Sequence, residues 1–166
     1  MTVATSGSAT LTLPTDEQIL ITREFAAPKH LVYKAWTTPE LVKRWWNAKR
    51  GEVTIAEIDL RVGGKWRWVM IADGGLEVGF HGEYLEIVPD ERLVATEVYE
   101  GAEAPAGVGP PVNTVAFSET GDGRTRMTLL TECHTKELRD LIVDSGMEGG
   151  MQDQMDALEG LAISLA

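Results

Sequence analysis

The chain has 166 residues, one cysteine and a formal net charge of −11 at neutral pH. This acidic balance argues against broad electrostatic binding to nucleic acid or to an anionic membrane surface. A single cysteine excludes an internal disulfide framework, and no apolar run approaches the ~18–20 residues that span a bilayer. We therefore expect a cytoplasmic protein with no nucleic-acid partner and no membrane insertion.

The start of the chain differs in composition from the rest. Residues 1–15 are rich in Ser, Thr and Ala and lack both the basic and the apolar regions of a secretory signal. They predict a flexible N-terminal segment that could include a short strand at Thr10–Leu13. The remaining length is sufficient for one hydrophobic core, so residues 16–166 are expected to form a single domain.

Hydrophobic patterning predicts three closely spaced elements next. An alternating strand over 19–25 is followed by two short helices, over 28–36 and 39–46, each beginning at a proline. Proline suits the first helical turn, where its missing N–H has no partner, and Thr38 is a favourable N-cap for the second helix.

A run of alternating segments occupies the middle of the chain, separated by glycine-containing turns and by a loop over 101–111. The predicted strands are 53–60, 65–71, 76–88, 92–99, 112–119 and 124–133. Gly79 and Gly82 interrupt the longest of these strands, which predicts a bend or a bulge there. Together with the first strand, we expect six or seven antiparallel strands.

The C-terminal region is predicted to be helical in two parts. Thr135 can cap a first helix, and after a glycine-rich junction apolar residues keep helical spacing from Met147 to Ala162. An antiparallel sheet of this size needs cover on one face. The expected fold class is therefore α+β, a curved sheet wrapped around a long C-terminal helix.

Four segments in order carry a family resemblance: ITREFAAPKHLVYKAWTTPELVKRWW, EIDLRVGGKWRWVM, GEYLEIVPDERLVATE and SGMEGGMQDQMDALEGLA. They resemble the START-like (SRPBCC) superfamily, in particular its bacterial branch similar to the C-terminal domain of the activator of heat-shock-protein-ninety ATPase. The resemblance implies a helix-grip fold with two short helices after the first strand. It implies little about activity, because relatives include lipid binders, cyclases and co-chaperones. No matched motif is a catalytic signature, so no catalytic residue is assigned.

Large, soft side chains are expected to line a cavity between the sheet and the C-terminal helix. Apolar ligand sites are usually concave and lined by aromatic groups, and methionine adapts to irregular ligand shapes. An ordinary filled core would use the same side chains. The residues assigned to ligand binding are Trp46, Trp66, Trp68, Met70, Phe80, Tyr84, Phe117, Met127, Met147, Met151 and Met155.

Polar chemistry is less evident in the sequence. His81 and Glu83 share one strand face, and with Tyr84 and Glu97 they are the candidates for catalysis. A charged pair on a water-facing sheet surface is the simpler explanation of His81 and Glu83. Neither HxxxH nor CxxC spacing appears, so no metal and no cofactor is expected.

The predicted function is therefore binding of a small hydrophobic or aromatic ligand. One alternative is an enzyme of the cyclase, dehydratase or hydrolase type, which requires at least two of the four polar candidates to converge inside the cavity. Another is a chaperone-cofactor-like module that binds a protein partner, which requires an exposed apolar patch. A homodimer is compatible with all three functions.

Overall fold

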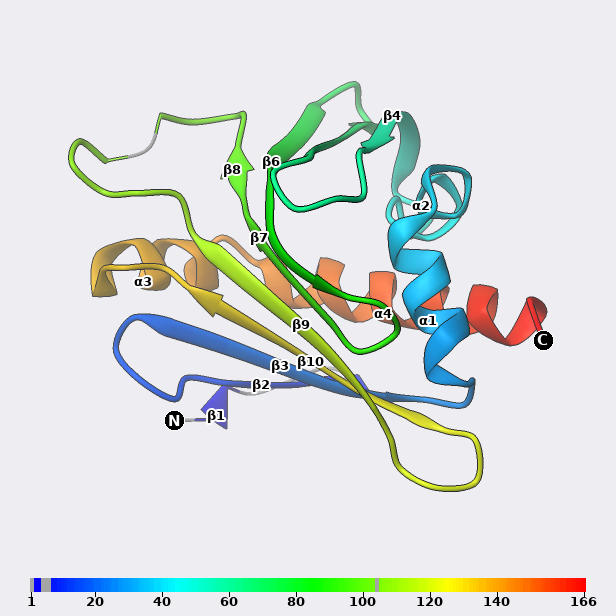
Figure 1. Cartoon of the computed structure of the whole chain (residues 1–166). Coiled ribbons are helices and arrows are strands. Elements are labelled where there is room, and N and C mark those ends of the chain that lie inside the picture. The colour runs from blue at the N-terminus through cyan, green and yellow to red at the C-terminus, as the bar shows by residue number, and fades with distance from the viewer. Residues whose placement is uncertain (1, 4–6, 104) are drawn as a thin grey trace.

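The computed structural model describes residues 2–3, 7–103 and 105–166 (Figure 1). Within this part of the chain, ten strands form one antiparallel sheet in the order β1-β2-β3-β10-β9-β7-β6-β5-β4, with β8 paired to β6. The strands are β1 (Thr2–Val3), β2 (Thr10–Thr12), β3 (Gln18–Phe25), β4 (Gly51–Ile58), β5 (Lys65–Ala72), β6 (Glu77–Val88), β7 (Arg92–Thr96), β8 (Val98–Tyr99), β9 (Val112–Glu119) and β10 (Thr125–Glu132). The helices are α1 (Lys29–Thr37), α2 (Pro39–Trp45), α3 (Lys136–Asp144) and α4 (Met147–Ser164).

The predicted helix-grip fold is confirmed, since the curved sheet wraps around the C-terminal helix α4 (Figure 1). The sheet has more strands than the six or seven expected. The additional strands β1, β2 and β8 are only two or three residues long. The end of the predicted strand 92–99 forms β8, and β2 coincides with the short strand suggested at Thr10–Leu13, whereas β1 has too few residues to show alternation.

The long strand β6 produces much of the curvature. Its first part pairs with β5 and its last part with β7, so β6 belongs to both halves of the sheet. The register shifts between Tyr84 and Glu86, close to the bend expected at Gly82. A Cβ atom at Gly82 would lie 1.8 Å from the carbonyl oxygen of Thr96. Only glycine fits at this position.

The helix ends follow the sequence signals in part. Thr135 caps α3 as predicted, because its hydroxyl oxygen accepts a hydrogen bond from the Leu138 N–H (3.1 Å). Thr38 occupies the N-cap position of α2 as predicted, although its side chain makes no capping hydrogen bond. Gly146 separates α3 from α4 with a positive φ of 82°, a conformation that glycine adopts without steric cost.

One hydrophobic core lies between the sheet and α4. The side chains of α4 that point into it include Met151, Met155 and Leu158, all buried. The prediction of a flexible segment over 1–15 stays untested, but β2 lies within that segment and pairs with β3. Ala9 and Leu11 are fully buried there. Across the described residues, no helix combines the length and the apolarity that a bilayer crossing needs.

Candidate functional site

All five tryptophans of the chain gather on the concave side of the sheet. Trp68 is at the centre of this cluster. The ring centroids of Trp36, Trp45, Trp46 and Trp66 lie 6.5, 5.9, 5.8 and 5.3 Å from that of Trp68. All four contacts have the edge-to-face geometry that aromatic rings favour.

Local structure explains why the rings meet. The two-residue period of β5 places Trp66 and Trp68 on the same face. Helix α2 ends beside that face and brings Trp45 and Trp46 onto it. Opposite Trp66 on β6 stands Gly82, where a Cβ atom would lie 2.7 Å from the Trp66 indole nitrogen. The missing side chain at Gly82 therefore leaves room for the Trp66 ring.

The indole N–H groups of the cluster are not equally satisfied. Trp45 Nε1 donates to the carbonyl oxygen of Ala35 (2.9 Å), and Trp66 Nε1 donates to that of Thr96 (3.2 Å). Trp68 is only 7% exposed, and its Nε1 has no hydrogen-bond partner among the described residues. A buried donor without an acceptor costs about 1–3 kcal/mol, so this N–H is available to an acceptor that enters the core.

The eleven residues assigned to ligand binding lie in or against one continuous core cluster. Eight are buried: Trp46, Trp66, Trp68, Tyr84, Phe117, Met127, Met151 and Met155. The other three, Met70, Phe80 and Met147, are partly exposed and pack against the cluster. Because a filled core would use the same side chains, their role in ligand binding stays a prediction.

A row of polar side chains interrupts this apolar face. The Thr131 hydroxyl donates to Asn113 Oδ1 (2.7 Å), and Asn113 Nδ2 donates to a carboxyl oxygen of Glu97. Asn113 and Thr131 stand opposite each other on β9 and β10, in the same inward series as buried Phe117 and Met127. Sequence reasoning named Glu97 and missed the other two. The available signal was a polar residue at an inward position of an alternating strand.

Burial changes the acid–base properties of groups on this face. Desolvation raises the pKa of Glu97, against the lowering effect of the hydrogen bond from Asn113. Desolvation, followed by the charge of Glu132, raises the pKa of the Cys133 thiol to about 11. Cys133 is therefore a neutral thiol at physiological pH and a poor nucleophile. Burial also raises the pKa of Tyr84 above its ordinary value.

The other two catalytic candidates are engaged in ion pairs at exposed positions. His81 Nδ1 lies 2.8 Å from a carboxyl oxygen of Glu100, which also pairs with Arg67. Glu83 pairs with Lys65 (2.6 Å). Of the four polar candidates, only Tyr84 and Glu97 belong to the concave side. In the described part of the chain, no group of three or more His, Cys, Asp or Glu residues could hold a metal ion.

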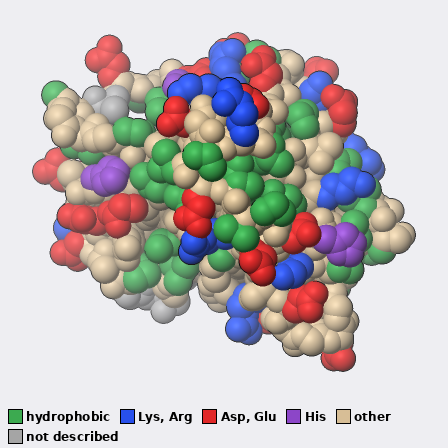
Figure 2. Space-filling model, viewed as in Figure 1, with side chains coloured by type: hydrophobic (Ala, Val, Ile, Leu, Met, Phe, Trp, Pro, Cys, Tyr) green, Lys and Arg blue, Asp and Glu red, His purple; other side chains and the backbone are tan. Residues whose placement is uncertain are grey.

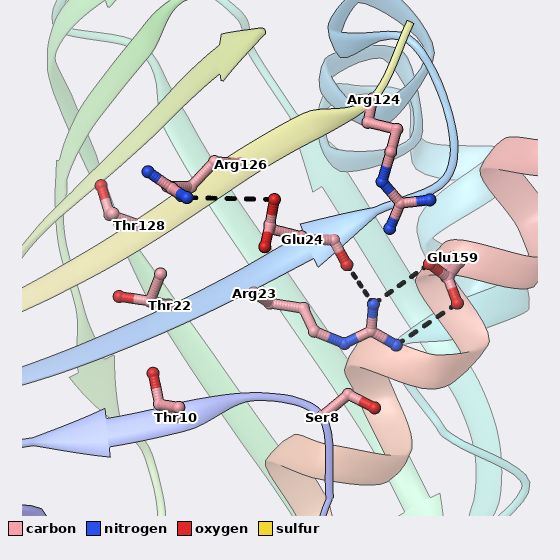
Figure 3. Close-up of a pocket in the computed structure, with 9 residues that line it drawn as sticks. All are labelled: Ser8, Thr10, Thr22, Arg23, Glu24, Arg124, Arg126, Thr128 and Glu159. Carbon is pink, nitrogen blue, oxygen red and sulfur yellow. Dashed lines mark hydrogen bonds and ion pairs between the residues drawn. The ribbon is translucent and has the colours of Figure 1, made fainter. Parts of the chain in front are cut away.

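A polar surface groove of about 660 Å³ lies beside β3, β10 and α4 (Figure 3). Figure 3 shows Arg23 reaching from β3 to Glu159 of α4, with Arg124 and Arg126 on the neighbouring strand side. Arg23 is 5% exposed and also pairs with Asp156 (2.8 Å). None of the residues assigned to ligand binding lines this groove. The ion pairs of Arg23 and Arg126 indicate a structural junction between the sheet and α4, although Arg23 Nε is buried without a hydrogen-bond partner among the described residues.

Exposed hydrophobic residues are spread over the surface. On the face shown in Figure 2, hydrophobic side chains gather near the middle but are broken up by acidic and basic ones. Large apolar side chains that are exposed come from several elements and loops: Leu60, Val62, Leu76, Leu85, Tyr99, Leu141 and Ile163. Isolated exposed apolar residues are normal on a protein surface.

The fold and the aromatic concave face define a START-like protein of the helix-grip type. More specifically, the chain belongs to the family of activator of Hsp90 ATPase homolog 1-like proteins, whose model matches residues 26–162. The resemblance noted in the sequence is thus confirmed. Among curated proteins, none matches this chain.

Solved structures with the same fold include several from bacteria and one from Plasmodium falciparum. A crystal structure from Rhodobacter sphaeroides is 23% identical with a TM-score of 0.84, covering 95% of this chain and 99% of the other. One from Nitrosomonas europaea is 27% identical with a TM-score of 0.79, covering 92% and 97%. An Hsp90 activator from Plasmodium falciparum is 22% identical with a TM-score of 0.55, covering 70% and 73%. At 22–23% identity, the likeness shows the fold alone.

Proposed function

We propose that this protein binds a small hydrophobic or aromatic molecule between the concave face of the sheet and α4. The observation that carries this proposal is the indole N–H of Trp68, a buried donor without a partner in the described structure, surrounded by the four other tryptophans. Ligand pockets typically combine an apolar aromatic lining with a few polar groups that orient the ligand. A ligand acceptor at Trp68 would remove the cost of the unpaired donor.

Incomplete cover at one part of the concave face supports the same proposal. Phe80 and Ala95, on neighbouring strands, stay partly exposed, as do Asn113 on β9 and Thr131 on β10. Residues further along the same inward series, such as Phe117, are buried beneath the helices. Under this proposal a ligand reaches the tryptophan cluster from solvent past this band of partly exposed inward side chains.

The proposal is tested by titrating the protein with the neutral dye Nile red, following dye emission and intrinsic tryptophan emission together. We expect saturable binding of one dye per chain, with both signals sharing one midpoint because all five tryptophans lie in one cluster. Absence of saturable uptake by the folded wild-type protein would contradict the proposal.

A matched pair of variants locates the site. Ala95 lies on the concave face of β7, packed against the core cluster, whereas Ala116 lies on the opposite face of β9, next in sequence to buried Val115 and Phe117. Ala95→Phe should weaken dye binding at least tenfold, because the larger side chain would occupy the partly exposed part of the concave face. Ala116→Phe should leave it unchanged. Equal binding by the two folded variants would place the dye elsewhere.

A chaperone-cofactor role is a second candidate, favoured by membership of the family of activator of Hsp90 ATPase homolog 1-like proteins. Its test is whether the protein changes the rate of ATP hydrolysis by a purified Hsp90-class chaperone. An unchanged rate at saturating concentrations would count against this role and leave the ligand-binding proposal standing.

A further inference from the structure

We propose that Glu97, Asn113 and Thr131 form the polar end of the ligand site, and that its ligand is a planar apolar ring system bearing a hydroxyl group. This inference rests on the proposed function. It specifies which class of hydrophobic molecule the site takes, and it assigns the recognition of that molecule to three side chains outside the aromatic cluster.

The direction of the hydrogen bonds leaves one group unused. Thr131 donates to Asn113 Oδ1, so the Asn113 amide is held with its Nδ2 toward Glu97. Asn113 Nδ2 then donates to Glu97 Oε2. None of the described residues forms a hydrogen bond with the other carboxyl oxygen, Glu97 Oε1, and this oxygen keeps some contact with solvent. Glu97 is the last member of this hydrogen-bonded row, and its Oε1 can accept a hydrogen bond from a ligand on the concave face.

The chemistry of this oxygen favours a hydroxyl group over a cation or a purely apolar group. Burial favours the neutral form of Glu97, which reduces its attraction for an ammonium group. A hydroxyl can donate to an ionised carboxylate and accept from a protonated carboxyl, so it matches Glu97 in either state. A purely apolar ligand would desolvate the carboxyl without replacing its lost hydrogen bond, which is unfavourable.

The aromatic cluster is attached to the chain one residue before Glu97. Glu97 follows Thr96, whose carbonyl oxygen accepts the hydrogen bond from the Trp66 indole (3.2 Å). Trp66 in turn contacts Trp68, with ring centroids 5.3 Å apart. A ligand whose hydroxyl reaches Glu97 therefore has its ring system beside Trp66, where aromatic stacking and edge-to-face contacts are favourable.

The test compares two probes that differ only in the hydroxyl group, 2-naphthol and naphthalene, by competition against Nile red. In the wild-type protein we expect 2-naphthol to bind about tenfold more tightly, the effect of one well-placed hydrogen bond. Glu97→Val should abolish this preference and leave naphthalene affinity unchanged. Glu97→Gln, which keeps a hydrogen-bonding group, should retain most of it. Glu83→Val, at an exposed ion pair, serves as the control and should behave as wild type.

The outcomes separate this inference from the proposed function. If neither probe competes, the proposed function fails and this inference with it. If both probes compete equally well, the concave face binds apolar molecules but Glu97, Asn113 and Thr131 do not recognise a hydroxyl group. Only this inference is then overturned. Should Glu97→Val not fold, a wild-type crystal structure with 2-naphthol decides. Its oxygen within hydrogen-bonding distance of Glu97 supports the inference, and any other position overturns it.

Discussion

The side-chain amide of Gln152 hydrogen-bonds both backbone groups of Ala9. Gln152 Oε1 accepts from the Ala9 N–H (3.0 Å), and Gln152 Nε2 donates to the Ala9 carbonyl oxygen (2.8 Å). Both residues are buried, and they are 143 positions apart in the sequence. The amide takes the place of a neighbouring strand. It satisfies both backbone hydrogen-bonding groups of Ala9, just before β2, and attaches this N-terminal segment to α4.

Replacing Gln152 by alanine is expected to destabilise the protein by about 2–4 kcal/mol, because two buried backbone groups lose their partners at about 1–3 kcal/mol each. The free energy of unfolding from urea titration measures this loss. The control is Gln154→Ala on the same helix, which removes one partly buried bond to the Trp46 carbonyl oxygen (2.7 Å) and should cost about 1 kcal/mol. Equal losses in the two variants would show that the pairing with Ala9 contributes little.

The contact between Gln152 and Ala9 also shows what the sequence could and could not predict. The alternation of Trp66 and Trp68 places both rings on the face of β5 that joins the core cluster, because a strand has a period of two, although Val69 on the other face is also buried. The alternation of Thr10 to Leu13 suggested a short strand there, and Leu11 is buried where β2 pairs with β3. The burial of Ala9 could not be predicted in this way, because its two hydrogen bonds are to Gln152, on a helix at the other end of the chain.

The candidate site could be predicted in composition but not in its polar details. Apolar periodicity identified the aromatic and methionine residues of the core. It could not identify Trp68 as the tryptophan with an unpaired N–H, since the acceptors for Trp45 and Trp66 are backbone carbonyl groups positioned by tertiary packing. The partnership of Glu97 with Asn113 likewise depends on the register of strands that are distant in sequence.

The ion pairs between β3 and α4 are expected to contribute unequally. Arg23 is 5% exposed and pairs with Glu159, which is 27% exposed, and with Asp156, which is 62% exposed. Glu159 also accepts a hydrogen bond from the Ala26 N–H (3.0 Å). Glu159→Ala should therefore cost about 2–3 kcal/mol, because it leaves a buried guanidinium poorly paired. Asp156→Ala should cost less than about 1 kcal/mol, as exposed pairs do.

Thermal and urea unfolding of these two variants and of Arg23→Met provide the check. Arg23→Met removes the buried charge and keeps much of the side-chain volume, so its loss should be smaller than that of Glu159→Ala. If Asp156→Ala were the most damaging of the three, the assignment of the main pairing to Glu159 would be wrong.

Gly82 is expected to tolerate no side chain. A methyl group there would lie 1.8 Å from the Thr96 carbonyl oxygen and 2.7 Å from Trp66 Nε1. Gly82→Ala should cost about 3 kcal/mol or more through overpacking, and it should change the near-ultraviolet circular dichroism by displacing Trp66. Gly79→Ala on the same strand is the control. Its methyl group would meet the end of the flexible Glu100 side chain at 2.8 Å, which can move away. Similar stability of the two variants would contradict this account of β6.

Glu97 and Glu100 are expected to give opposite dependences of stability on pH. Burial raises the pKa of Glu97 above its ordinary value of 4.5, despite the hydrogen bond from Asn113. The hydrogen bond from Arg67, opposed by burial and aided by the one with His81, lowers the pKa of Glu100 to about 2. The native state thus holds the Glu97 proton to higher pH than the unfolded chain does, so stability falls as pH rises from 4.5 through the native pKa. For Glu100, stability is present above 4.5 and is lost as pH falls toward 2.

The matched variants are Glu97→Gln and Glu100→Gln, each compared with the wild type by urea unfolding from pH 3 to pH 8. Glu97→Gln should be more stable than wild type at pH 8, where ionisation of the buried carboxyl is unfavourable, and close to it at pH 4, where both side chains are neutral. Glu100→Gln should be less stable than wild type at pH 8, and its deficit should shrink below pH 4.5. A Glu97→Gln variant that is less stable than wild type at pH 8 would show that the Glu97 carboxylate is stabilised in the native state, contrary to its raised pKa.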